Sequence, residues 1–293
     1  MTALAPFLAL LAAVANAVSN VLQRSGNRHQ QDEDEFSLAL LKELFTDRIW
    51  LIGLAVVLAS FLIQAAAIGV GELALVEPLV VLELPITLIL GKFFLDGELR
   101  RREWLSIATM TAGVVGLVLC LGPSGGSAST VDGLTWGLAT TTTAVMVAVL
   151  FGIPRFRPLE AGVEAALLGS AAGVCFGLTS ALTKGAISAL SQGPAALFEA
   201  WQTYLVMVFG LGSMWLLQQA FNSGRLVAAQ PGVTLADPLV AILWGTLVFG
   251  ETTNGPIALA FAGLFTVVMA LGGVLLAHSA ATSAGNAESE GSG

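Results

Sequence analysis

The chain has little of what a soluble surface or an enzyme active site requires. Only 11% of its 293 residues are charged, and it contains two histidines, two cysteines and one tyrosine. His29 and His278 lie far apart, and the sequence has no HExxH, GxSxG or glycine-rich phosphate loop. We therefore expect neither an enzyme nor a cofactor. Cys120 and Cys175 have no CxxC or histidine neighbour, so the pattern does not indicate a disulfide or a metal site.

The abundant residues indicate a polytopic membrane protein whose first partner is the lipid bilayer. Hydrophobic residues make up 56% of the chain, and the mean hydropathy is +0.84. Because a span needs roughly 20 apolar residues, the sequence predicts about nine transmembrane helices. Their approximate ranges are 4–23, 49–69, 73–95, 103–121, 132–151, 162–187, 197–218, 226–248 and 256–278. The absence of sustained polar and apolar alternation favours an all-α fold over a transmembrane barrel.

Two stretches of the sequence repeat each other. Residues Glu77 to Glu98 match Gln230 to Glu251 at a constant offset of 153, with 8 of 22 positions identical. Each copy has two prolines seven residues apart and ends in Gly-Glu. Leu11 to Ser25 also aligns with Ala171 to Gly185 at an offset of 160. These matches predict an internal duplication of a four-helix unit.

The duplication predicts the organisation of the whole chain. The second unit begins five crossings after the first, so the two units are expected to be inverted relative to each other, a construction typical of secondary transporters. The predicted parts are a first repeat (1–121, helices 1–4, with a cytoplasmic loop at 24–48), a linker with an unpaired helix 5 (122–160), a second, inverted repeat (161–278, helices 6–9) and a disordered tail (279–293).

The charges of the loops predict the orientation in the membrane. With alternating crossings, eleven of the twelve basic residues fall on one side and only Lys184 falls on the other. The positive-inside rule then places the N-terminus outside and the C-terminus in the cytoplasm of a multi-pass protein of the plasma or inner membrane. The formal net charge is −8, which does not suggest a nucleic-acid partner.

Two acidic residues are expected near the middle of the bilayer. Counting about 1.5 Å per residue from the predicted helix ends places Glu83 and Asp237 at similar depths in equivalent helices. A buried charge in a membrane is costly and marks candidate ion or substrate sites. Glu83 and Asp237 are therefore predicted to bind a cation, a proton or a basic group of the substrate, and to bind metal if the substrate is Mg²⁺. The alternative is a structural role satisfied by hydrogen bonds within the bundle.

Other polar residues and four prolines are secondary candidates. The further substrate- or ion-binding candidates are Glu77, Asn16, Asn20 and Gln64, for which interhelical hydrogen bonding is the alternative. The candidates for a hinge or helix break are Pro78, Pro85, Pro231 and Pro238, because proline removes a backbone donor; simple packing kinks are the alternative. We interpret Glu98 and Glu251, which end their spans, as cap or turn residues.

These features resemble the drug/metabolite transporter superfamily, whose EamA-type members have ten helices in two repeats. Nine helices, the segment Ser19 to Arg24, and the run Ala74 to Leu79 before Gly97-Glu98-Leu99 are more similar to the NIPA-type magnesium transporters of that superfamily. The sequence departs from that pattern at Glu77 and Glu83, which interrupt a helix that is largely uncharged in NIPA-type proteins.

The resemblance implies a secondary transporter that works by alternating access. The expected substrate is a small solute or metabolite, and the alternative is Mg²⁺, which is usually held through one or two carboxylates while keeping several waters. Protons are a further candidate partner. A membrane protein with a structural role and no transport activity is the third class, and tight packing around Glu83 and Asp237 would favour it.

Overall fold

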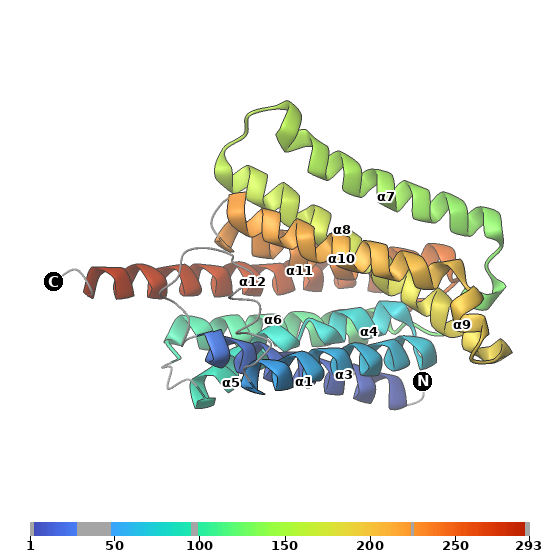
Figure 1. Cartoon of the computed structure of the whole chain (residues 1–293), viewed down its shortest axis with the longest axis horizontal. Helices are drawn as coiled ribbons and strands as arrows, with labels where there is room; N and C mark the ends of the chain where they lie inside the picture. Colours follow the sequence, from blue (N-terminus) through green and yellow to red (C-terminus); the bar gives the residue numbers. More distant parts are fainter. Residues whose placement is uncertain (1–2, 28–47, 95–98, 224–225, 291–293) are drawn as a thin grey trace.

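The protein is built from helices that run along one common direction (Figure 1). The structure, a computed structural model, describes residues 3–27, 48–94, 99–223 and 226–290. Residues 28–47 of the predicted cytoplasmic loop, and Glu98, lie outside these ranges. In the described part of the chain no strand is present, and a single pair of residues, Ser124 and Thr252, forms an isolated antiparallel bridge. The all-α prediction is confirmed.

Nine helical segments in the described ranges are long and apolar enough to cross a membrane, which confirms the predicted spans. The helices are α1 (Leu4–Asn27), α3 (Arg48–Val70), α4 (Leu73–Val80), α5 (Glu83–Phe94), α6 (Arg101–Leu121), α7 (Gly133–Phe156), α8 (Ala161–Ala189), α9 (Ala196–Glu199), α10 (Trp201–Ser223), α11 (Leu226–Leu243) and α12 (Pro256–Glu290). Helices α4 and α5 together form the third span, and α11 continues into a π-helical segment, η3 (Trp244–Val248).

The helices pair in a regular way. α1 packs against α3, α4 and α5, α8 packs against α10 and α11, and α6 packs against α12. α7 lies at one edge of the bundle against α8, and the two ends of the chain lie at opposite ends of the bundle (Figure 1).

Asp132 caps the start of α7 by accepting a hydrogen bond from the Thr135 amide at 3.4 Å. Hydrogen bonding to Thr135 lowers the pKa of this exposed carboxyl.

Glycines allow α6 and α12 to approach closely. A Cβ atom added at Gly113 would lie 2.6 Å from the Met269 backbone nitrogen, and one added at Gly272 would overlap Met110. Ser106 Oγ donates to the Gly272 carbonyl at 2.6 Å. Small residues at helix crossings are a usual means of membrane helix association because they bring the backbones together. This contact joins the predicted first and second repeats.

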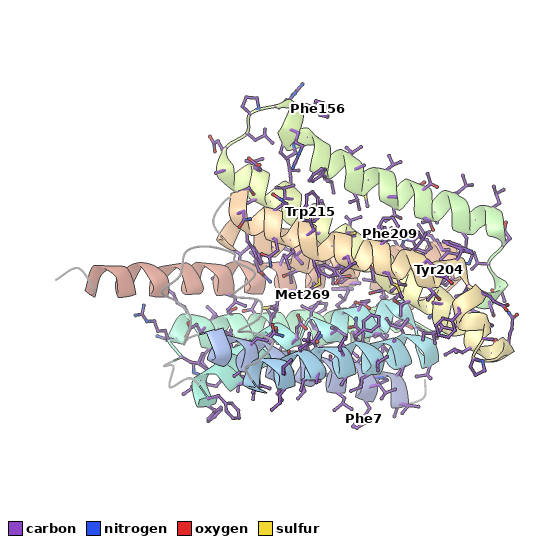
Figure 2. All side chains as sticks on the ribbon, viewed as in Figure 1. Phe7, Phe156, Tyr204, Phe209, Trp215 and Met269 are labelled. Carbon is purple, nitrogen blue, oxygen red and sulfur yellow. The ribbon has the colours of Figure 1, made fainter. Side chains whose placement is uncertain are left out.

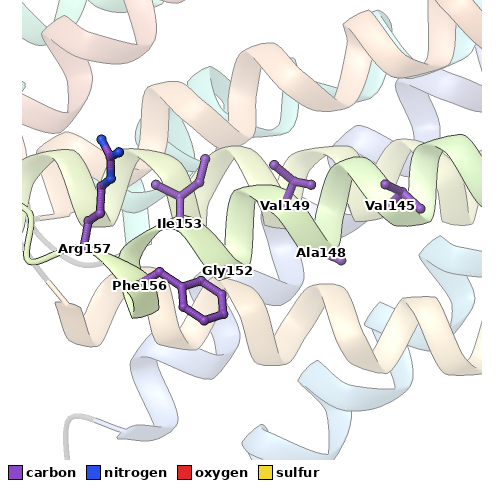
Figure 3. Close-up of a pocket in the computed structure, with 7 residues that line it drawn as sticks. All are labelled: Val145, Ala148, Val149, Gly152, Ile153, Phe156 and Arg157. Carbon is purple, nitrogen blue, oxygen red and sulfur yellow. The ribbon is translucent and has the colours of Figure 1, made fainter.

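The outward surface is apolar, as expected for a protein embedded in lipid. Figure 2 shows Phe7 and Phe156 projecting from the outer helices, where they are 62% and 88% exposed, whereas Met269 lies inside the bundle. A groove of about 560 Å³ runs beside the C-terminal half of α7 (Figure 3). Apart from Arg157, the side chains that line it are apolar, as suits a surface covered by acyl chains.

Pro85 explains why the third span is interrupted between α4 and α5. A proline at this position has no N–H for the carbonyl of Val81, and its ring crowds that carbonyl. The Leu84 amide donates to the Val81 carbonyl instead, at 3.2 Å, in a tight turn. At Pro78, Pro231 and Pro238 the described helices continue without the expected break. Each proline removes only one hydrogen bond, and the helix packing supports the rest; a hinge role stays a prediction.

α12 extends into the tail that the sequence predicts to be disordered. The helix continues to Glu290, and residues 279–290 prolong an existing helix, which avoids the unfavourable nucleation step. The division of the chain into two repeats, a linker and a disordered tail stays a prediction.

Candidate functional site: an acidic cavity between the third and eighth spans

A small cavity lies between the α4–α5 span and α11. Its volume is about 90 Å³, and its lining includes three carboxylates, from Glu77, Glu83 and Asp237. The other lining residues are Val80, Val81, Leu84, Gln230, Val233, Thr234 and Pro238. None of them is basic. The repeated segments of the sequence thus supply the two walls of a single cavity.

The three carboxylates have different surroundings. Glu77 is 2% exposed, and its Oε1 accepts a hydrogen bond from Gln64 Nε2 at 3.0 Å. The Glu83 carboxyl is within hydrogen-bonding reach of the Asn16 side chain. The Asp237 Oδ1 atom is buried and has no hydrogen-bond partner among the described residues. A buried acceptor without a partner costs free energy. Of the three acids, Asp237 would therefore gain most from a bound cation or proton.

Local structure brings these acids into the cavity. The interruption before Pro85 makes Glu83 the first residue of α5, where the helix N-terminus favours a negative charge. The Asp237 side chain lies one residue before Pro238, which cannot donate a hydrogen bond to Thr234. The Thr234 carbonyl therefore lacks its usual helical donor, and the Thr234 hydroxyl donates one turn back to the Gln230 carbonyl at 2.9 Å. The prolines of the repeat therefore lie beside the acids of the cavity.

Three carboxylates in so small a space must be neutralised. Like charges repel strongly where water is scarce, and Glu77 and Glu83 both act electrostatically on Asp237. Within the described ranges, no three Asp, Glu, His or Cys side chains are close enough together to hold one metal ion directly. The geometry therefore suits protons, or a cation that keeps part of its water shell.

The structure separates the predicted site residues into three groups. The acids Glu77, Glu83 and Asp237 line the cavity, together with Pro238. Asn16 and Gln64 lie behind them as hydrogen-bond partners. Asn20 is exposed on α1, and Asn20, Pro78, Pro85 and Pro231 are not among the lining residues. Binding by any of these residues stays a prediction.

Sequence reasoning missed a buried ion pair. Lys184 Nζ on α8 lies 3.0 Å from Glu251 Oε1. The Glu251 carboxylate also accepts hydrogen bonds from the Leu73 amide at 2.7 Å and the Ala74 amide at 3.0 Å. Glu251 thus caps a helix, but this helix is α4, in the predicted first repeat. The available signals were the recurring Gly-Glu and the isolation of Lys184 from the other basic residues.

Comparison with known proteins gives a relative of similar length. The chain is 31% identical over 253 residues to the uncharacterized protein Cgl0250/cg0304 of Corynebacterium glutamicum, covering 83% of this chain and 85% of that protein. The chain belongs to the same family as this corynebacterial protein. No protein-family model matches the chain, and no solved structure matches it.

A more distant relative carries a functional description. Over 257 residues the chain is 21% identical to the probable magnesium transporter NIPA9 of Arabidopsis thaliana, covering 83% of this chain and 73% of that protein. The chain is thus distantly similar to a protein described as a probable magnesium transporter. The nine helical segments of the described ranges that are long and apolar enough to cross a membrane agree with this similarity.

Proposed function

We propose that the protein is a secondary transporter that carries a small cation across the membrane by alternating access, without enzymatic activity. The observation that carries this proposal is the cavity with three carboxylates, whose described lining includes no basic residue. A cation that enters this space would be attracted by all three acids and would relieve their mutual repulsion.

The volume of the cavity favours a cation over the metabolite that the resemblance implied. A space of about 90 Å³ has room for a few water molecules. Drug-sized ligands occupy pockets several times larger. A small ion with part of its hydration shell therefore fits the cavity better than an organic solute does.

Among small cations we propose Mg²⁺ as the first substrate to test. Mg²⁺ is usually bound through one or two carboxylates and keeps several waters, which agrees with acids that surround a space without forming a direct metal cage. The distant similarity to a probable magnesium transporter supports the same ion. Retained waters would bridge the ion to those carboxylates that do not contact it directly.

We infer that transport uses two inverted repeats. The helix pairing supports a duplication, because α1 packs on α3, α4 and α5 as α8 packs on α10 and α11. The acids come from the matching spans α4–α5 and α11, so relative motion of the repeats would expose the cavity to one side at a time. With the charge distribution of the loops, the N-terminus is proposed to lie outside and the C-terminus in the cytoplasm of a cell membrane.

Flux into proteoliposomes tests the function. Purified protein is expected to carry Mg²⁺ above the rate of empty liposomes, and Glu83→Gln and Asp237→Asn are each expected to reduce the flux strongly. Asp132→Asn is the matched control, because it removes an exposed carboxylate outside the cavity.

Two results would contradict the proposal. Folded protein that carries no Mg²⁺ above empty liposomes would refute the choice of ion and redirect the search to amines and other organic solutes under a proton gradient. Flux that is equal in the parent protein and both cavity variants would place the pathway elsewhere.

A further inference from the structure

The ion pair between Lys184 and Glu251 joins four segments at one end of the bundle. Lys184 belongs to α8, and Glu251 follows η3. Besides its contact with Glu251, Lys184 Nζ donates to the Gly71 carbonyl, in the turn between α3 and α4, at 2.7 Å. The Glu251 carboxylate holds the first two amides of α4. One pair of side chains therefore connects the start of α4 with α8 and with the segment before α12.

The pair is shielded from water. Lys184 is 7% exposed and Glu251 is 3% exposed, and the Lys184 ammonium faces the Phe249 ring at 5.6 Å. Glycine leaves the space that the carboxylate occupies, because a Cβ atom at Gly245 would overlap Glu251 Oε2. Buried ion pairs are weak sources of stability because desolvation opposes the attraction between the charges. A pair that is this closely surrounded instead specifies one arrangement of the segments that it joins.

The pair is also coupled to the acidic cavity through α4. Glu77 lies one helical turn after Leu73 and Ala74, whose amides bind Glu251. If Glu251 leaves, the first amides of α4 and the Lys184 ammonium lose their partners, and water must replace them. Separation of the pair would therefore admit water at this end and free the helix that carries Glu77 into the cavity.

We propose that Lys184 and Glu251 form the gate that closes this end of the molecule, and that they are positioning residues for Glu77 through the start of α4. The proposal rests on the transport function above, in which the cavity must open to each side in turn. The charges of the loops assign this end to the outer face, since Lys184 is the basic residue predicted to lie there.

Thiol accessibility tests the gate without any substrate. The parent carries Cys120→Ala, Cys175→Ala and Val233→Cys, which puts a single thiol in the lining of the cavity, on α11. A membrane-impermeant thiol reagent is added to the outer face of intact cells, and the labelling rate is measured.

Two variants in this parent loosen the gate by different means. Glu251→Gln removes the charge, and Gly245→Ala keeps both charged residues but fills the space beside the carboxylate. Each is expected to raise the labelling rate about tenfold or more, which is the effect of losing one charge-assisted hydrogen bond on an equilibrium. Gly245→Ala is the variant to rely on if Glu251→Gln fails to fold. Thr252→Val is the matched control, because it alters the next residue and its exposed bonds to Ser124.

A charge-swapped variant tests whether Glu251 acts by capping α4 or only by pairing with Lys184. Lys184→Glu combined with Glu251→Lys keeps opposite charges together but places a cation at the N-terminus of α4, where it is unfavourable. Labelling is expected to stay fast in this version. A return to the slow rate of the parent would refute the positioning of α4.

The outcomes separate the gate from the transport function. Slow labelling in Glu251→Gln and Gly245→Ala, with Mg²⁺ flux intact, would overturn the gate and leave the function standing. Fast labelling in both, with no Mg²⁺ flux in the unmodified protein, would support the gate and overturn the proposed cation.

Discussion

Asp237→Asn is expected to make the protein more stable without a cation and less responsive to one. The Asp237 Oδ1 atom is buried without a partner beside Glu77 and Glu83. An unsatisfied buried polar group costs about 1–3 kcal/mol, and more when it is charged. The amide of asparagine removes the charge and can donate to the neighbouring carboxylates. The free energy of unfolding should therefore rise by about 1–3 kcal/mol, a shift in Tm of about 2–6 °C at this chain length.

The response to Mg²⁺ should change in the opposite direction. A ligand at a hundredfold excess over its Kd stabilises the folded state by about 2.7 kcal/mol. The parent protein should show this gain when Mg²⁺ is added, and Asp237→Asn should lose most of it because one of the three acids is gone. The substitution thus exchanges binding for stability, as expected of a strained functional site.

Thermal unfolding in detergent, followed by the fluorescence of the six tryptophans, measures both effects after treatment with a chelator. Asp132→Asn is the matched control: asparagine also caps helices well, so its Tm and its Mg²⁺ response should equal those of the parent. The reasoning is refuted if Asp237→Asn unfolds at a lower temperature than the parent in cation-free buffer, or if it gains as much from Mg²⁺ as the parent does.

Two further substitutions test the packing and the interrupted span. Gly113→Val should destabilise the protein by about 1–3 kcal/mol or more, because overpacking here meets the backbone of α12. The yield of folded protein in detergent measures this effect, and Gly263→Ala, which meets nothing within 4 Å, should match the parent. Pro85→Ala should restore a donor for the Val81 carbonyl, stabilise the span by up to about 3 kcal/mol and slow Mg²⁺ flux. Unchanged flux in a more stable protein would show that the interruption has no part in transport.

The sequence alone determined the class of the protein and the approximate ranges of its spans. The nine spans follow from the thickness of the bilayer and from the need to satisfy every backbone group within each segment. Whether a segment is long and apolar enough to meet both requirements depends only on its own residues, so hydropathy along the sequence records it. The acids of the third and eighth spans were conspicuous for the same reason, since a charge is rare in an apolar segment.

Only the tertiary structure decided which of these groups meet. Pro78 and Pro85 match Pro231 and Pro238, yet the third span is interrupted at Val81 and Leu82, while α11 is continuous. The neighbouring helices, which differ between the two copies, decide whether a freed carbonyl opens a turn or is tolerated within the helix.

Helix packing also explains why Asn16 and Asn20 have different surroundings and why the sequence did not predict the contact between Lys184 and Glu251. Asn16 reaches Glu83, whereas Asn20, one turn later on the same helix, is exposed. Glu251 caps a helix that begins 178 residues earlier in the chain. Neither contact follows from spacing, because each depends on which helix faces pack together and how closely small residues let them approach. The composition of the spans determines that they cross the membrane, and the packing of the helices determines where their charged side chains lie.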